Sequence, residues 1–205
     1  MIGRMQTTAG FHLLPGRLSP RAQAALVDKV LAAADAAPFW RPVTPGGKPM
    51  SVEMTGRGPL CWMTDASGYR YEAAHPATGA AFPAIPPLLL DLWGELCDPA
   101  VPPDACLVNL YREGAKMGLH QDKDEADFGF PVLSVSLGDT AVFRIGGTGR
   151  GDPTRSVRLA SGDVCLLAGE ARLAFHGIDR IIPGSSRLVP GGGRINLTLR
   201  RARPA

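Results

Sequence analysis

Two histidines and an aspartate are the residues of this chain whose types and spacing could hold a metal. His120 and Asp122 stand two residues apart in LHQDKDE, and His176 lies far downstream in RLAFHGI. Alternate residues of an extended segment point to the same side, so His120 and Asp122 would face one space. Two imidazoles and one carboxylate bind Fe(II) on one face and leave three positions open. The pattern H-x-D alone also arises by chance, so its weight depends on the elements around it.

A second polar pattern lies near the C-terminus, in the segment RINLTLR that begins at Arg194. In a strand, residues 194, 196, 198 and 200 share one face, which then carries two guanidiniums, an amide and a hydroxyl. A protein interior accepts two guanidiniums only beside anions, and a dicarboxylate supplies one for each. An edge strand with solvated arginines is the alternative for this segment alone. Together with His120, Asp122 and His176, the pattern favours a dicarboxylate site.

The elements that must position these residues are expected to be strands from Ala105 onward. Short apolar runs alternate with Gly, Pro and Asp turns: ACLVNLY, VLSVSLG, AVFRIGG, RSVRLA, DVCLLAG, RLAFHGI and RINLTLR. Such spacing predicts an all-β sandwich or barrel. VLSVSL and INLTLR alternate strictly, so each should pack one face and turn the other toward solvent or a cavity.

The N-terminal half is expected to be mixed. Ser19 and Pro20 predict the start of a helix that ends before Pro38, and LLLDLWGEL predicts a second, short helix. Between Trp40 and Tyr71, half-apolar pieces separated by Gly turns predict hairpins. The whole chain, with 25 Gly and 19 Pro in 205 residues, is interpreted as one turn-rich, β-rich α+β domain.

Charge and cysteine content exclude several classes of protein. Lys and Arg number 22 against 19 Asp and Glu, and the resulting charge of +3 is too small to coat nucleic acid by bulk charge. The four cysteines show no C-x-x-C spacing, so we expect free thiols, buried at Cys97, Cys106 and Cys165. The sequence contains no signal-peptide pattern and no run of 18 apolar residues, which predicts a cytoplasmic protein without membrane contact.

Longer segments resemble a known family. The segments NLYREGAKMGLHQDKDEADFGFPVLSVSLGDTAVFRIGG, SGDVCLLAGEARLAFHGI and GRINLTLRRA are similar to the AlkB family of Fe(II)- and 2-oxoglutarate-dependent dioxygenases, which repair alkylated nucleic acid bases. Upstream, TPGGKPMSVEMT, CWMT and GYRY resemble the nucleotide-recognition lid of that family, so the resemblance covers residues 40–203. It implies a double-stranded β-helix (jelly-roll) core over residues 105–203, a hairpin lid over 41–80 and N-terminal helices in a segment over 1–40.

The resemblance implies a role for each residue that matches the family's motifs. His120, Asp122 and His176 are then the iron ligands and catalytic centre. The co-substrate 2-oxoglutarate is held at its distal carboxylate by Arg194 with Asn109 and Tyr111, and at its iron-chelating end by Arg200 with Asn196. These eight residues make up the expected iron and co-substrate site.

Further matches concern the substrate base. The resemblance implies that Asp124 contacts the base and that Trp62, Tyr69 and Met54 lie over the flipped base and its phosphate. Without it, Asp124 would be interpreted as a solvated charge, and Trp62 and Met54 as core residues. Two positions depart from the pattern, because Lys48 stands where a Tyr is familiar and Leu167 where a Trp is. His12 and His75 match no motif and are expected at the surface.

The implied activity is oxidative demethylation of N1-methyladenine and N3-methylcytosine in DNA, preferably single-stranded. It would use Fe(II), O2 and 2-oxoglutarate and release formaldehyde, succinate and CO2, with the protein acting as a monomer. An RNA base demethylase with the same chemistry is an alternative, because single-strand recognition by stacking tolerates either sugar. A non-catalytic jelly-roll module that binds nucleic acid is a further alternative.

Overall fold

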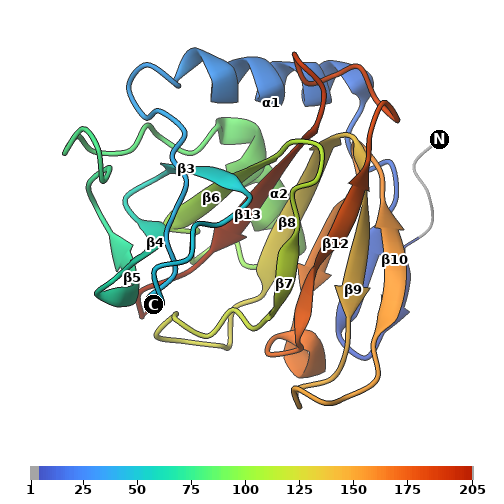
Figure 1. Ribbon diagram of the computed structural model, residues 1–205. Coiled ribbons are helices and arrows are strands. Elements are labelled where there is room, and N and C mark those ends of the chain that lie inside the picture. Colours follow the sequence, from blue (N-terminus) through green and yellow to red (C-terminus); the bar gives the residue numbers. More distant parts are fainter. Residues whose placement is uncertain (1–4, 205) are drawn as a thin grey trace.

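The computed structural model describes residues 5–204, and two antiparallel sheets dominate it. The larger sheet has seven strands in the order β1 (Gln6–Thr8), β2 (Phe11–Leu14), β11 (Val164–Leu167), β8 (Val132–Gly138), β13 (Arg194–Arg200), β6 (Ala105–Tyr111) and β3 (Glu53–Arg57). The smaller sheet has four, in the order β10 (Arg155–Leu159), β9 (Thr140–Ile145), β12 (His176–Ile182) and β7 (Met117–His120). A separate hairpin joins β4 (Cys61–Asp65) to β5 (Gly68–Glu72). This is the expected β-rich jelly-roll architecture, with the two sheets side by side in Figure 1.

Strict alternation along the larger sheet separates two cores. In β13, Ile195, Leu197 and Leu199 are fully buried in a core shared with the helices. The opposite face of the same sheet supplies Leu107, Cys165 and Leu167 to a second core, which it shares with Phe143 and Ile178 of the smaller sheet. The polar residues of β13 lie on this inner face, because side chains along a strand alternate between its two sides. The space between the sheets therefore receives the polar groups that could do chemistry.

Two helices cover the outer face of the larger sheet, and Figure 1 shows α2 behind β6 and β13. Helix α1 (Pro20–Ala32) begins where expected, with the side chain of Ser19 accepting a hydrogen bond from the backbone N of Ala22. It ends at Ala32, earlier than expected, because Arg57 on β3 donates to the carbonyls of Lys29 and Val30 that a further turn would use. Within residues 5–204, neither α1 nor α2 (Pro87–Leu96) is long and apolar enough to cross a membrane.

The structure differs from the sequence-based expectation at four strands. The segment over residues 1–40, expected to be helical, contains the strands β1 and β2 before α1. Strand β7, which ends at His120, was not expected, because its sequence MGLH is too short to show a period. Strand β12 begins at His176, whereas the segment before it forms a short 3₁₀ turn (Gly169–Ala171). The two histidines of the proposed metal site therefore lie at strand ends.

Individual side chains also require corrections. His75, expected at the surface, is only 1% exposed, because its Nε2 bonds the carbonyl of Pro38 and its Nδ1 accepts from the backbone N of Ala77. His12 is half-buried in β2. All four cysteines are free thiols, and Cys97, expected to be buried, is half-buried at the end of α2.

Candidate active site

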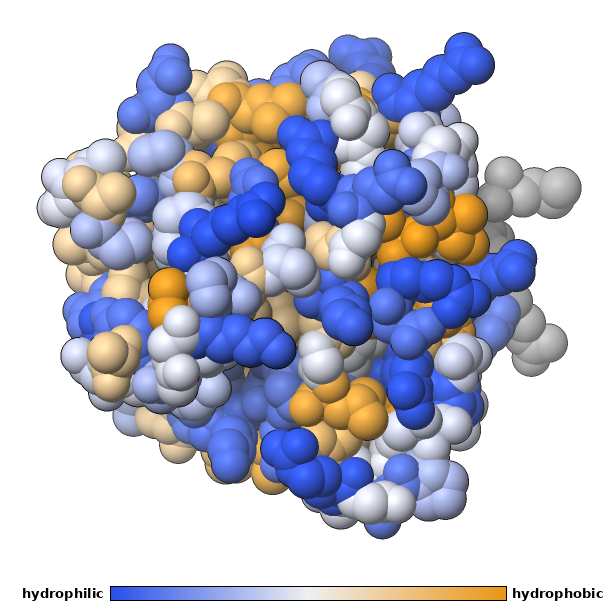
Figure 2. Space-filling model, viewed as in Figure 1, coloured by the Kyte–Doolittle hydropathy of each residue, from blue (hydrophilic) through white to orange (hydrophobic). Residues whose placement is uncertain are grey.

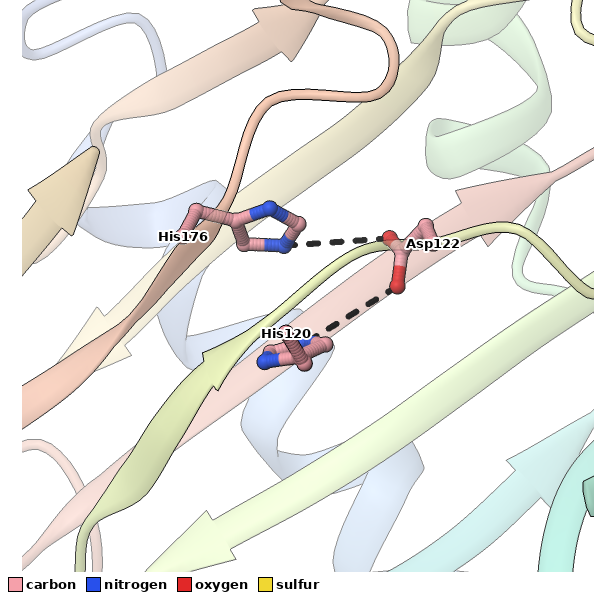
Figure 3. Close-up of side chains that lie close together, drawn as sticks. All are labelled: His120, Asp122 and His176. Atoms are coloured by element: carbon pink, nitrogen blue, oxygen red, sulfur yellow. Dashed lines mark ion pairs between the residues drawn. The ribbon is translucent and has the colours of Figure 1, made fainter. Parts of the chain in front are cut away.

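The two candidate histidine ligands are cross-strand partners. His120 is the last residue of β7 and His176 the first of β12, and the register places them directly opposite each other. Asp122 follows in the loop after β7, with Oδ1 3.8 Å from His120 Nε2 and Oδ2 3.9 Å from His176 Nε2. One ligand atom from each residue lies within 4.8 Å of the others. Figure 3 shows the three side chains converging on one space, as a facial metal site requires.

Backbone contacts prepare both imidazoles for metal binding. The Nδ1 of His120 lies 2.9 Å from the carbonyl of Gly118, and the Nδ1 of His176 lies 2.9 Å from that of Ala174. A proton on Nδ1 donates to each carbonyl, which leaves Nε2 free to bind a metal. Burial, together with the nearby His120, lowers the pKa of His176 to about 4, so its ring is neutral at physiological pH. His176 can therefore offer its Nε2 to a metal ion.

The carboxylate of Asp122 is ionised as well. Burial alone would raise the pKa of Asp122, but the positive charge and the hydrogen bonds of Arg200 outweigh burial and hold this pKa below its usual range. Both Nε and Nη2 of Arg200 donate to Oδ2 of Asp122, at 3.1 and 2.8 Å. A buried carboxylate with such a partner stays charged and presents its second oxygen to a cation.

Buried polar atoms without partners form a candidate site for the co-substrate. Across residues 5–204, the buried side-chain atoms without a hydrogen-bond partner include Nε and Nη1 of Arg194, Nη1 of Arg200 and Oδ1 of Asn109. Arg194 is 1% exposed, and a guanidinium buried with two unused N–H groups needs an anion beside it. One arginine stands at each end of β13, so a dicarboxylate the size of 2-oxoglutarate fits this donor set.

Neighbouring side chains fix the donors in place. The Nη2 of Arg194 donates to Ser136 Oγ at 3.0 Å, and its guanidinium lies 5.4 Å from the ring centre of Tyr111. Burial raises the pKa of Tyr111 to about 12, so its hydroxyl remains protonated and can donate to a carboxylate. Two hydrogen bonds to β8 hold Asn196: its Nδ2 donates to Ser134 Oγ at 2.7 Å and to the carbonyl of Val135 at 3.0 Å.

One cavity of about 790 Å³ joins all these groups. Its lining includes every site residue expected from the sequence: Met54, Trp62, Tyr69, Asn109, Tyr111, His120, Asp122, Asp124, His176, Arg194, Asn196 and Arg200. Four cationic side chains, Lys48, Lys116, Lys123 and Arg150, also line it. Figure 2 shows hydrophilic side chains over much of the face in view, with separate hydrophobic areas between them.

The comparisons with known proteins agree with this geometry. Residues 10–200 match the family model of the 2OG-Fe(II) oxygenase superfamily. The chain is 69% identical over 196 residues to an alpha-ketoglutarate-dependent dioxygenase AlkB homolog of Caulobacter vibrioides, covering 96% of this chain and 89% of that protein. It is 44% identical to the AlkB dioxygenase of Escherichia coli, covering 82% of this chain and 80% of that one. The chain belongs to the AlkB family.

The solved structures add a likeness of fold to this AlkB-family chain. The structure of OsALKBH1 superposes with a TM-score of 0.83 at 31% identity and covers 97% of this chain and 100% of that one. As a member of the AlkB family, the protein is a dioxygenase that requires Fe(II) and 2-oxoglutarate. The alternative of a non-catalytic binding module is therefore wrong. Family members that match the chain include proteins named as demethylases of DNA and of tRNA.

In this AlkB-family protein, the β4–β5 hairpin contributes Trp62 and the exposed Tyr69 to the lining of the cavity. Trp62 and Tyr69 stack with ring centres 5.7 Å apart and planes 18° apart. The Nε1 of Trp62 donates to Oδ2 of Asp124 at 2.6 Å. Met54 belongs to β3 instead of the hairpin and is fully buried, so it contributes to the wall of the cavity.

Several residues of the site were missed by the sequence analysis. Ser134 and Ser136 hold Asn196 and Arg194, and their alternation in VLSVSL was a usable signal, since both lie on the inner face of β8. Glu125 and Arg172 form a buried ion pair behind the metal site, with Nη2 of Arg172 3.0 Å from Oε2 of Glu125. No local pattern indicates this pair, because its members meet only in the folded chain.

Proposed function

We propose that this dioxygenase removes the methyl group from N1-methyladenine and N3-methylcytosine in DNA, with a preference for single strands. One observation carries the proposal: a stacked aromatic pair and an exposed carboxylate line the same cavity as the metal ligands. The pair is Trp62 with Tyr69, and the carboxylate is that of Asp124, two residues after the ligand Asp122. Aromatic faces and a carboxylate both attract a flat cation.

Access to the methyl group requires an unpaired base. The methyl groups of these two lesions sit on the Watson-Crick edge, which is closed inside a duplex, so the base must be flipped or already single-stranded. The cavity of about 790 Å³ is large enough for one base together with 2-oxoglutarate. A single strand avoids the energy needed to open a base pair, which supports the proposed preference.

Recognition rests on stacking and on charge. Both lesions carry a positive charge that an ordinary base lacks, and Asp124 provides an opposite charge at the cavity. Trp62 offers an aromatic face, and the ring of His120, which is half exposed to the cavity, lies deeper. A cationic base is therefore attracted to the position where its methyl group faces the metal ligands.

The chain's own groups orient the reactants. When Fe(II), O2 and 2-oxoglutarate are bound, they supply the oxidation of the methyl carbon, with conversion of 2-oxoglutarate to succinate and CO2. Arg194 and Arg200 would hold the two carboxylates of 2-oxoglutarate, and His120, Asp122 and His176 would hold Fe(II). The sheets on either side exclude bulk water. The hydroxymethyl product then releases formaldehyde and leaves an unmodified base.

An RNA substrate is the second candidate, because stacking and charge recognition tolerate either sugar. The deciding experiment measures formaldehyde release from matched DNA and RNA oligonucleotides that carry the same N1-methyladenine, each as a single strand and as a duplex. Fastest release from single-stranded DNA is the expected result. Faster release from RNA would replace the proposed substrate, and no release from any of the four would overturn the proposed reaction.

We further propose that the enzyme acts as a monomer, which sedimentation can test.

A further inference from the structure

The β4–β5 hairpin contacts the loop that carries the metal ligand at two adjacent positions. Trp62 and Tyr71 are cross-strand partners on the hairpin. Trp62 donates from Nε1 to Asp124, and Tyr71 donates from its hydroxyl to Oε1 of Glu125. Asp124 and Glu125 lie two and three residues after Asp122 in the β7–β8 loop (residues 121–131). The hairpin is thus docked directly onto the metal-binding loop.

Glu125 is a buried carboxylate shared by three separate elements. Its side chain is 1% exposed. Oε1 accepts from Tyr71 of the hairpin and lies 3.4 Å from Nε of Arg200 on β13, and Oε2 accepts from Nη2 of Arg172 at 3.0 Å. A buried charge with this set of partners cannot move without leaving one of them uncompensated, which is costly in the interior.

Arg172 joins the two chain segments that supply the metal ligands. It lies four residues before His176, and its Nη1 donates to the backbone carbonyl of Asp122 at 2.7 Å. Its Nε donates to the carbonyl of Phe130 at 2.8 Å, at the far end of the same loop. The ring of Phe128 lies 5.3 Å from the guanidinium and is itself 42% exposed, so it shields Arg172 from solvent.

We propose that Glu125 is a positioning residue that couples docking of the β4–β5 hairpin to the geometry of the metal site. Tyr71 connects the hairpin to Glu125 through its hydroxyl. Arg172 connects Glu125 to the backbone carbonyl of Asp122, and Arg200 connects it to the carboxylate of Asp122. The inference rests on the proposed function only in treating the hairpin as part of the substrate site, since the contacts do not depend on which base is bound. Coupling of this kind is reciprocal, so metal binding must stabilise the docked hairpin as much as docking strengthens metal binding.

The test uses the full chain and Co(II) alone, without nucleic acid. Hydrogen exchange of the amides over residues 61–72 is measured with and without Co(II), and the Co(II) dissociation constant is measured by titration. Tyr71→Phe removes only the hydroxyl that reaches Glu125. Thr64→Val is the matched control, because it removes another buried hydroxyl of the same hairpin, which donates to the carbonyl of Val43 at 3.3 Å.

In the wild type and in Thr64→Val, Co(II) is expected to slow exchange in the hairpin. In Tyr71→Phe this effect of Co(II) should vanish, and Co(II) should bind about fivefold more weakly or worse. Glu125→Gln should weaken Co(II) binding too, and adding Tyr71→Phe to it should cause little further loss, since both act through one contact.

The proposal is overturned if Tyr71→Phe keeps both the Co(II)-dependent protection and a dissociation constant within about twofold of wild type. It is also overturned if Thr64→Val loses them equally, because the effect would then be general loosening of the hairpin. Neither result bears on which methylated base is the substrate. Failure of the proposed reaction would appear only in the formaldehyde assay, so the two proposals fail separately.

Discussion

Arg200 and Asp122, from distant parts of the chain, form a buried ion pair in which one guanidinium donates two of its nitrogens to the carboxylate proposed to bind the metal. The Nη2 and Nε atoms of Arg200 lie 2.8 and 3.1 Å from Oδ2 of Asp122, while its Nη1 has no partner within residues 5–204. In the proposed site, the same side chain therefore orients a metal ligand and offers a free N–H to the co-substrate. Binding of the metal and of 2-oxoglutarate should depend on each other through Arg200.

Arg200→Lys tests this dual role. Lysine keeps the charge but loses the planar fork that reaches Asp122 and a carboxylate together. We expect weaker binding of both Co(II) and 2-oxoglutarate, by about tenfold each, because a hydrogen bond to a charged group contributes roughly 1.5–3 kcal/mol. Calorimetric titration measures the two affinities separately. Loss of 2-oxoglutarate affinity with unchanged Co(II) affinity would show that Asp122 does not need Arg200.

His120→Ala should abolish turnover of 2-oxoglutarate and binding of Co(II), with the fold retained. His120 is one of three proposed ligands and is half-exposed at the end of β7, so its replacement leaves no large buried cavity. His12→Ala is the control, since this half-buried histidine lies on β2 outside the cavity. Metal content, succinate release and circular dichroism are the measurements. Near-normal activity in His120→Ala would disprove the metal assignment.

Arg194→Ala should raise the 2-oxoglutarate concentration needed for half-maximal rate by two to three decades. Loss of one partner from a buried charged pair costs about 3–5 kcal/mol, and each decade corresponds to about 1.4 kcal/mol. Oligonucleotide affinity, measured by fluorescence anisotropy, should barely change, because Arg194 is only 1% exposed. Equal weakening of both affinities would mean that Arg194 contacts phosphate.

Asp124→Ala should reduce demethylation of cationic lesions selectively. A charge-assisted contact contributes about 1.5–3 kcal/mol, so the rate for N1-methyladenine should fall roughly ten- to a hundredfold relative to neutral N3-methylthymine. Trp62→Phe is the comparison, because it keeps a smaller aromatic face and removes the N–H that bonds Asp124. It should affect both lesions alike. Metal content is measured alongside, and an equal decline of both lesions in Asp124→Ala would refute charge recognition.

Binding to single-stranded DNA should depend only shallowly on salt. Four cations line the cavity besides the buried Arg194 and Arg200. Each phosphate neutralised on a single strand contributes about −0.7 to the slope of log affinity against log salt, so we expect a slope of about −3. Lys116→Ala should reduce the slope by about 0.7. Arg158→Ala, an exposed cation on β10 outside the cavity, should leave it unchanged. A slope near −8 would reveal a far larger basic surface.

Patterns within a single strand were predictable from the sequence because the period of two is a local property of the extended backbone. The alternation of RINLTLR placed Arg194 and Arg200 on one face, and the structure buries both on the inner side of β13. The spacing of His120 and Asp122 likewise indicated a shared direction. Helix α1 could be located from Ser19 and Pro20, since capping depends on neighbouring residues alone.

Relations between strands were decided only by the tertiary structure. Pairing of β7 with β12 sets His120 opposite His176, and nothing local to either segment specifies that register. His75 gave no sign of burial, because its partner Pro38 lies on a separate segment. The Arg172–Glu125 pair and the contact of Tyr71 with Glu125 also join segments distant in the chain. Sequence alone therefore determined which chemical groups face inward. Packing of the two sheets and the hairpin determined which of those groups meet, because long-range pairing depends on how the whole chain folds.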